Sequence, residues 1–237
     1  MPTAPLASLL PRAVPAIADV GLALCARLPA RPDDRLAPLA DGRPIATLLI
    51  VGWRGRRGWD AFAASPEAGD DRPDPLDRWS RRVIDALAAR LGGRALYPFD
   101  GPPWRPFQAW AARGGRSFPS PLGLTIDPDV GLWQSFRGAL ALAEPLDEPI
   151  VAGVSPCDAC RDRPCLTACP VAAFDGATYA VARCRAHLED PMGASCRDDG
   201  CRARRACPVG RDHVYAPAQI RFLMRAFRAA PPFEDPT

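Results

Sequence analysis

The fold of this chain depends on one stretch, Cys157-Asp-Ala-Cys160-Arg-Asp-Arg-Pro-Cys165-Leu-Thr-Ala-Cys169-Pro170. Its cysteines are spaced C-x2-C-x4-C-x3-C, and a proline follows the last of them. Such short gaps allow three thiolates from one loop to bind three corners of an iron–sulfur cube. Because Pro170 fixes its own φ and turns the chain away, we expect Cys169 to point towards a second site.

A second group of four cysteines ends in the same Cys-Pro pair. In bacterial ferredoxins the run C-x2-C-x2-C-x3-C-P gives its last cysteine to the other cluster, and here the second gap is two residues longer. Two Cys-Pro endings therefore imply that two 4Fe-4S clusters exchange their fourth ligands. We predict one cluster held by Cys157, Cys160, Cys165 and Cys207, and another held by Cys169, Cys184, Cys196 and Cys201.

The ninth cysteine, Cys25, is remote from both groups and is expected to be a small buried residue. Two zinc sites would also use eight thiolates, but zinc ribbons usually show paired C-x2-C knuckles, and this sequence has one. Disulfides are disfavoured in a reducing compartment. We expect a cytoplasmic location, because the N-terminus lacks a basic-then-apolar signal and the run Ile45–Val51 is too short to cross a bilayer.

The composition excludes several classes of function. The 237 residues carry a formal net charge of only +3, so a polyanion-binding field is not expected. Lysine is absent, and this excludes a P-loop lysine, a Schiff-base lysine and a lysine general base. The chain is 48% hydrophobic, enough for one sizeable core or two modest domains.

Helix and strand signals alternate along the first half, which predicts an α/β or α+β layer structure. The turn Gly52–Gly58 has neither dinucleotide-binding nor Walker A spacing, so ordinary turn geometry is favoured over anion binding. Asp74 is expected to cap the helix that follows it. Helices are predicted at 13–28, 59–64, 75–91, 106–113 and from 217, and strands at 45–51, 95–99, 122–126 and 138–142.

Arginines surround the cysteines of both groups, among them Arg163, Arg183 and Arg204. Nearby acids offset most of this charge, so a solvated surface is favoured over a docking face for an acidic redox partner. His187 and His213 are expected to have structural or solvent roles, and the alternatives are a place beside a cluster or a role as a proton donor.

The order of these segments resembles epoxyqueuosine reductase, a cobalamin-dependent enzyme with two 4Fe-4S clusters. The matching segments are Asp127–Trp133, Gly138–Leu142, the first cysteine run, Ala182–Leu188 and Cys201–Pro208. In that family the cysteine of the Ala182–Leu188 segment ligates the second cluster, as predicted for Cys184. The region after residue 216 predicts one helix rather than the family's helical-repeat domain for tRNA, so nucleic-acid binding is not expected.

Pro121–Gly138 and Asp74–Asp77 also resemble segments of CblC-type cobalamin-processing proteins. Both families have a nitroreductase-like α+β corrinoid domain, which the resemblance implies here. The family's catalytic aspartate lies in an Asp-Thr-Gly-Pro context, and Asp100-Gly101-Pro102 resembles it with one residue fewer. The resemblance thus makes Asp100 a candidate proton donor, with a turn aspartate as the alternative. Trp133 and Phe136 are the candidate cofactor-binding residues.

We therefore expect an α+β fold in which a nitroreductase- or CblC-like domain (1–150) precedes a ferredoxin-type dicluster domain (151–215) and a helical tail (216–237). The expected function is ferredoxin-like electron transfer to a redox partner protein. The alternative is an iron–sulfur oxidoreductase whose clusters reduce a cobalamin or flavin in the first domain. The sequence does not identify the oligomeric state.

Overall fold

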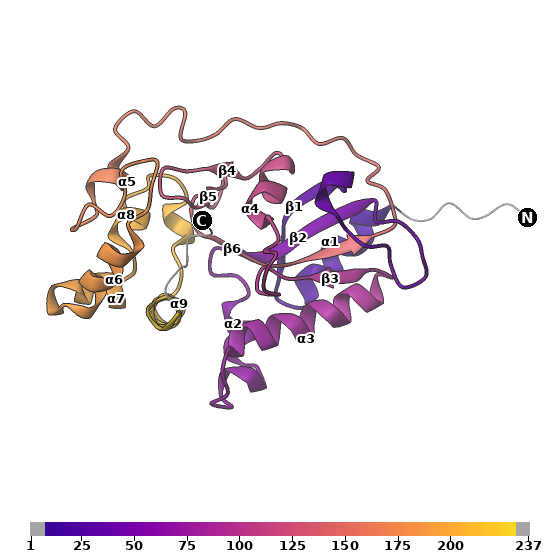
Figure 1. Ribbon diagram of the computed structural model, residues 1–237, viewed down its shortest axis with the longest axis horizontal. Helices are drawn as coiled ribbons and strands as arrows, with labels where there is room; N and C mark the ends of the chain where they lie inside the picture. Colours follow the sequence, from indigo (N-terminus) through magenta and orange to yellow (C-terminus); the bar gives the residue numbers. More distant parts are fainter. Residues whose placement is uncertain (1–7, 231–237) are drawn as a thin grey trace, which may run out of the picture. The chain divides into compact units, whose positions relative to one another are not determined.

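The computed structural model describes residues 8–230, which divide into two compact units (Figure 1). Unit 1 contains the residues up to Phe118 together with Gln134–Ser155, and unit 2 contains Pro119–Trp133 together with the residues from Pro156 onwards. The fold is mixed helix and sheet, which confirms the α+β class. The division differs from the predicted one, because residues 119–133 and the final helix belong to the cysteine-rich unit.

Unit 1 is built on a four-stranded antiparallel sheet in the order β1-β2-β6-β3. The two central strands are β2 (Thr47–Arg54) and β6 (Gln134–Leu142), with Thr47 opposite Leu142 and Val51 opposite Gly138. The outer strands are β1 (Ala23–Pro29) and β3 (Arg94–Leu96).

Helices cover both faces of this sheet. Helix α3 (Pro75–Arg90) packs on β6 and β3, whereas α4 (Phe107–Arg113) packs on β1 and β2, and Figure 1 shows them on opposite sides of the sheet. Every residue of β2 from Thr47 to Trp53 is buried, because neither face of that strand meets solvent. This explains why β2 appears in the sequence as a continuous apolar run rather than an alternating one.

The predicted helix over 13–28 is wrong in its second half. Helix α1 (Leu9–Asp19) ends in a Schellman motif, in which the Gly21 N–H donates to Ala18 O and the Leu22 N–H donates to Ile17 O. Gly21 takes the left-handed φ of 77° that this motif requires. The following residues form β1, because their backbone groups pair with β2. Tertiary pairing therefore overrides the apolar helical pattern.

The glycine-rich segment after β2 has turn geometry. Gly52 lies at a register shift against β6, where a Cβ atom would be 2.0 Å from Ser135 O. The turn leads into the short helix α2 (Trp59–Ala63), which is followed by one 3-10 turn before α3. Asp74 occupies the N-cap position of α3 in a left-handed conformation, but its side chain makes no capping hydrogen bond, contrary to expectation. The 3-10 turns of unit 1 are Pro32–Asp34 and Pro66–Ala68.

Unit 2 consists of short helices around a small core. The predicted strand over 122–126 is reduced to β5 (Thr125–Ile126), which pairs with β4 (Phe118–Pro119) at the boundary of the unit. None of the helices within residues 8–230 has the length and apolar character needed to cross a membrane. The helices of unit 2 are α5 (Pro164–Thr167), α6 (Val181–Glu189), α7 (Ala194–Asp198), α8 (Arg202–Arg205) and α9 (Pro217–Ala229), with 3-10 turns at Pro191–Gly193 and Arg211–His213.

Two glycines allow the backbone of the 119–133 segment to pack closely against the end of the cysteine region. A Cβ atom on Gly131 would be 2.2 Å from Val209 O, and one on Gly210 would be 2.3 Å from Val130 O. Both glycines have positive φ, 61° and 72° respectively. The Asp127 carboxylate shapes the turn before Gly131 by accepting the N–H groups of Asp129 and Val130. The two backbones approach so closely that only glycine fits at either position.

We expect Gly131→Ala to destabilise unit 2 by at least about 2 kcal/mol, because the methyl group meets a carbonyl oxygen and the residue has a positive φ. Gly123→Ala is the matched control, since Gly123 has a φ of 70° in the same segment and open space where its Cβ would lie. The control should cost about 1 kcal/mol. Thermal unfolding followed by near-UV circular dichroism measures both, and equal losses would contradict the close approach.

Candidate functional site

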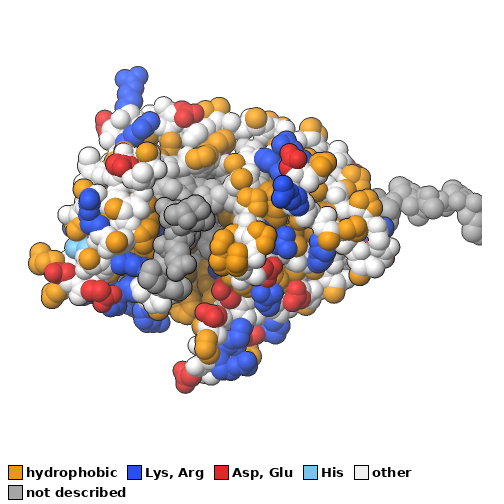
Figure 2. Space-filling model, viewed as in Figure 1, with side chains coloured by type: hydrophobic (Ala, Val, Ile, Leu, Met, Phe, Trp, Pro, Cys, Tyr) orange, Lys and Arg blue, Asp and Glu red, His pale blue; other side chains and the backbone are white. Residues whose placement is uncertain are grey.

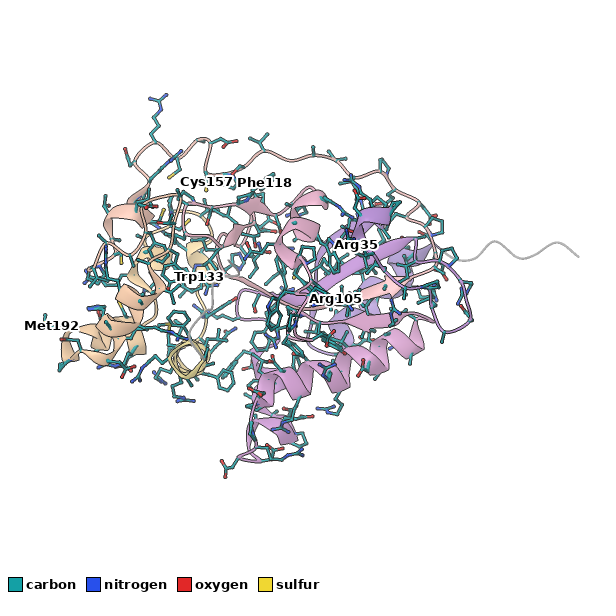
Figure 3. The ribbon with its side chains drawn as sticks, in the orientation of Figure 1. Arg35, Arg105, Phe118, Trp133, Cys157 and Met192 are labelled. Carbon is teal, nitrogen blue, oxygen red and sulfur yellow. The ribbon has the colours of Figure 1, made fainter. Side chains whose placement is uncertain are left out.

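The first cysteine-lined pocket of unit 2 is formed by loop and helix residues from three parts of the chain. Cys157 (Figure 3) and Cys160 lie in one turn, where the Cys160 N–H donates to Cys157 O at 3.2 Å. Arg163 has a left-handed φ of 40°, and Pro164 then begins α5. The two extra residues of the C-x4-C gap therefore lie in the turn that starts this helix. The pocket is lined by Cys157, Cys160, Cys165 and Cys207, and by Pro121, Ile126, Pro156, Arg163, Pro164, Pro208 and Val209.

The second pocket lies among the short helices that follow. Cys184 is on α6, Cys196 is on α7, and Cys201 is the N-cap residue of α8. Cys169 reaches this pocket from beyond the end of α5. The lining consists of Cys169, Cys184, Cys196 and Cys201, with Pro170, Val171, Phe174, His187, Leu188, Arg202, Ala203 and Met224.

The chain crosses between the pockets twice. Cys165 in α5 lines the first pocket, and Cys169, four residues later, lines the second. Cys201 lines the second pocket, and Cys207, after α8, lines the first. Helices α5 and α8 pack against each other, so the two crossings lie side by side. The division of the eight thiols between the pockets is the same as in the two predicted ligand sets, and their role as ligands remains a prediction.

Within each pocket, the cysteine sulfurs raise one another's pKa values. Burial raises the pKa of Cys165, and the neighbouring sulfurs of Cys207 and Cys160 raise it further. Burial likewise raises the pKa of Cys184, together with the sulfurs of Cys169 and Cys196, although a hydrogen bond from Tyr179 opposes this. Four thiolates in so buried a site repel one another unless a positively charged group lies between them.

Backbone N–H groups point at several of the sulfurs. The Ala173 N–H donates to Cys169 Sγ at 3.3 Å, and N–H groups at the start of α8 donate to Cys201 and lower its pKa against the larger raising effect of burial. Within residues 8–230, no three or more Cys, His, Asp or Glu side chains lie close enough together to hold one metal ion. A 4Fe-4S cube takes its ligands at four separate iron corners, and four thiols around one pocket, with N–H donors to sulfur, suit that group.

Tyr179 contacts a cysteine of the second pocket, and the sequence did not indicate this contact. Its hydroxyl hydrogen-bonds Cys184, and burial, followed by the Cys184 sulfur, raises the pKa of this phenol above its ordinary value. The ring stacks on Phe174 with centroids 4.5 Å apart. Tyr179 therefore places a hydroxyl donor at one corner of the second cysteine set. No spacing motif marks it, because its contact with Cys184 depends on how the turn before α6 folds back.

Arg204 has a structural role, contrary to its interpretation as a solvated surface arginine. Its guanidinium lies 4.5 Å from the centroid of the Trp133 ring and 4.7 Å from that of the Tyr215 ring. Its Nε and Nη2 groups both donate to Leu132 O, at 3.1 Å and 2.6 Å. Arg204 thereby ties α8, which lies between Cys201 and Cys207, to the 119–133 segment.

We expect Arg204→Leu to destabilise unit 2 by about 2 kcal/mol, because it removes a cation–π contact with two rings and two charged hydrogen bonds. Helix propensity is nearly unchanged by this substitution. Arg205→Leu is the matched control, since Arg205 is exposed on the same helix and makes one hydrogen bond to Asp199 O. The midpoint of thermal unfolding should fall clearly more for Arg204→Leu, and equal midpoints would contradict the role given to the ring contacts.

Other arginines of unit 2 also bind carbonyl oxygens. Arg183 donates to Ala172 O, Arg185 donates to Phe227 O, and Arg197 donates to both Leu188 O and Asp190 O. On the face in view in Figure 2, arginine side chains are interspersed with Asp and Glu. These arginines stabilise turns and helix ends within the unit, which offers an explanation for their number other than a basic docking face.

The candidate proton donor Asp100 and the candidate cofactor-binding residues Trp133 and Phe136 make other contacts. Asp100, on the loop after β3, forms an ion pair with Arg81 at 2.8 Å and accepts the Tyr97 N–H at 3.3 Å. Trp133 (Figure 3) belongs to unit 2, where it is buried against Tyr215 and Ile220. Phe136 is on β6 of unit 1 and packs on the hydrophobic cluster that contains Phe107 and Trp110 of α4. Each of the three side chains is thus engaged within its own unit.

The two histidines differ in their surroundings. His187 lies on α6, one turn after Cys184, and lines the second pocket. His213 lies in the 3-10 turn Arg211–His213, is exposed and lines neither pocket. Cys25 is buried on β1, remote in sequence from both pockets, and no disulfide joins any two cysteines within residues 8–230.

Comparison with known proteins gives a likeness of fold. No protein-family model matches the sequence, and no curated protein matches it. Among solved structures, the chain is similar to a crystal structure of selenomethionine-labelled epoxyqueuosine reductase, with a TM-score of 0.54 and 14% sequence identity. The match covers 90% of this chain and 68% of that chain. This chain therefore shares a fold with epoxyqueuosine reductase.

Proposed function

We propose that this chain is an electron-transfer protein that holds two 4Fe-4S clusters in unit 2. The observation that carries the proposal is the division of eight cysteines into two pockets of four, with Cys169 and Cys207 exchanged between the two sequence groups. Two unrelated structural thiol sets would not require both runs to give their last cysteine to the other pocket. A ferredoxin-type pair of clusters requires it.

The cysteine thiolates would hold the clusters, and a bound cluster supplies one-electron redox chemistry. The protein's own contribution is the environment of the sulfurs, namely the hydrogen-bond donors and the positive charges near them. N–H groups donate to Cys169, Cys201 and Cys207 and stabilise negative charge on them. Arg163 lines the first pocket and Arg202 the second. The charges of Arg211 and Arg185 also lower the pKa of Cys207 and of Cys184, respectively. Hydrogen bonds and positive charge at the sulfurs both favour the reduced state.

Anaerobic purification tests this proposal directly. The protein should be brown, carry about eight iron and eight sulfide per chain, and lose visible absorbance when dithionite is added. A colourless protein with about two zinc ions per chain would instead identify two structural zinc sites and refute electron transfer. The electron donor or acceptor would be a redox partner protein in the same compartment, which we place in the cytoplasm.

A second candidate is an iron–sulfur reductase, whose clusters deliver electrons to a cofactor in unit 1. The fold likeness to epoxyqueuosine reductase favours it, because the match covers 90% of this chain and so includes the sheet of unit 1. A nitroreductase- or CblC-like corrinoid domain would be the corresponding assignment for that sheet. However, Asp100, Trp133 and Phe136 make the contacts described above, so the case for cobalamin or flavin rests on the fold alone.

The two candidates differ in what the holoprotein binds. The cluster-loaded protein should be titrated with cobalamin and, separately, with a flavin, while the absorbance spectrum and co-elution in gel filtration are followed. A stoichiometric spectral change would favour the reductase. Lack of binding by either cofactor would favour the carrier.

A further inference from the structure

The His187 side chain has a buried nitrogen with an unusual environment. Its Nε2 atom is inaccessible to solvent and has no hydrogen-bond partner among residues 8–230. A buried imidazole nitrogen without a partner is costly, and native structures rarely leave one. The ring lines the second pocket together with Cys169, Cys184, Cys196 and Cys201. The missing partner is therefore expected inside that pocket.

The position of His187 is determined by its neighbours rather than by a flexible loop. It lies three residues after Cys184 on α6, so the two side chains are on the same face of the helix. The backbone of the 3-10 turn Pro191–Gly193 packs on its carbonyl, because a Cβ atom on Gly193 would be 1.9 Å from His187 O. Arg197 donates to the carbonyl of the next residue, Leu188, at 2.7 Å.

We propose that the His187 Nε2–H donates a hydrogen bond to a sulfur of the cluster held by Cys169, Cys184, Cys196 and Cys201, and thereby raises the reduction potential of this cluster above that of the other. This inference rests on the proposed function. Cluster sulfurs accept hydrogen bonds, and the four corners of the cube already have cysteine ligands, so the imidazole is a donor rather than a ligand.

The physical reason is the change in charge on reduction. One added electron makes the cluster sulfurs more negative, and a donor aimed at them stabilises the reduced state more than the oxidised state. No residue with a matching side chain lines the first pocket, whose lining contains Arg163 but no histidine. The two clusters should therefore differ in reduction potential, and the second cluster should be reduced first.

His187→Phe tests the inference because it keeps an aromatic ring and removes the donor. At a fixed potential the ratio of reduced to oxidised second cluster should fall about tenfold, which corresponds to about 59 mV for one electron. His213→Phe is the matched control, since it changes the exposed histidine that lines neither pocket. Potentiometric titration monitored by electron paramagnetic resonance gives the midpoint of each cluster in each variant.

His187→Gln retains an N–H donor and should recover most of the lost potential, which a purely packing role would not predict. Unchanged midpoints in His187→Phe with both clusters present would overturn the inference and would assign the Nε2 partner to a water molecule. Equal shifts in His187→Phe and His213→Phe would overturn it too. Wild-type protein without iron would instead refute the proposed function, and the metal content of the same samples separates the two failures.

Discussion

Cys169→Ser is expected to abolish the same cluster as Cys184→Ser, although Cys169 belongs by sequence to the run that begins at Cys157. The reason is that the chain leaves the first pocket after Cys165 and enters the second at Cys169. Each variant should lose about four iron atoms per chain and retain the spectrum of the first cluster. Conversely, Cys207→Ser should remove the first cluster and give the same residual spectrum as Cys157→Ser.

Iron analysis and electron paramagnetic resonance of the reduced variants measure these losses. Cys25→Ser is the control, because Cys25 is buried on β1 in unit 1 and belongs to neither pocket. It should retain about eight iron atoms per chain. If Cys169→Ser and Cys165→Ser gave one residual spectrum, and Cys201→Ser and Cys207→Ser another, the crossing would be wrong and each sequence run would bind its own cluster.

Removal of both clusters is expected to unfold unit 2 and leave unit 1 folded. Trp133, Tyr215 and Ile220 form one buried apolar cluster of unit 2, and the helices of this unit are mostly one or two turns long. Such helices are unstable without packing. In small metal-binding domains the binding free energy, about 10 kcal/mol or more for a structural metal, is also the folding free energy.

Hydrogen exchange with mass spectrometry, before and after treatment with ferricyanide and a chelator, measures this effect. The amides of α6, α7 and α8 should lose their protection. The central strands β2 and β6 provide an internal control, because their hydrogen bonds lie in a sheet covered on both faces and do not involve the cysteines. Retained protection in α6 to α8 would show that unit 2 folds without a bound group.

The elements predicted from the sequence were those with a strong local pattern. The apolar run at 45–51 became β2, and the amphipathic pattern after Asp74 became α3. The failures occurred where non-local pairing decides the outcome. Leu24 and Cys25 fit the apolar face of an amphipathic helix. They lie in β1 instead, because α1 ends before Gly21 and the backbone of this segment pairs with β2.

The predicted division of the chain failed at residues 119–133 for a similar reason. This segment precedes β6 in the sequence, and its motif Asp127–Trp133 looked like part of the first domain. In the structure it belongs to the second unit, where Gly131 approaches Val209 and Leu132 accepts hydrogen bonds from Arg204. These contacts join residues that are more than 70 positions apart in the chain. A hydrophobic periodicity describes only neighbouring residues, so it cannot predict such contacts.

The sequence by itself determined the residues of the candidate site, namely eight cysteines and two Cys-Pro pairs, and it predicted their division into two sets of four with an exchange of the last cysteines. It could do so because ligand spacing and the constraint of proline are properties of the local chain. Only the tertiary structure decided the setting of those cysteines, namely Tyr179 beside Cys184, Arg204 between two aromatic rings, and the buried Nε2 of His187 in the second pocket. These features arise from packing between short helices, and packing depends on the whole chain.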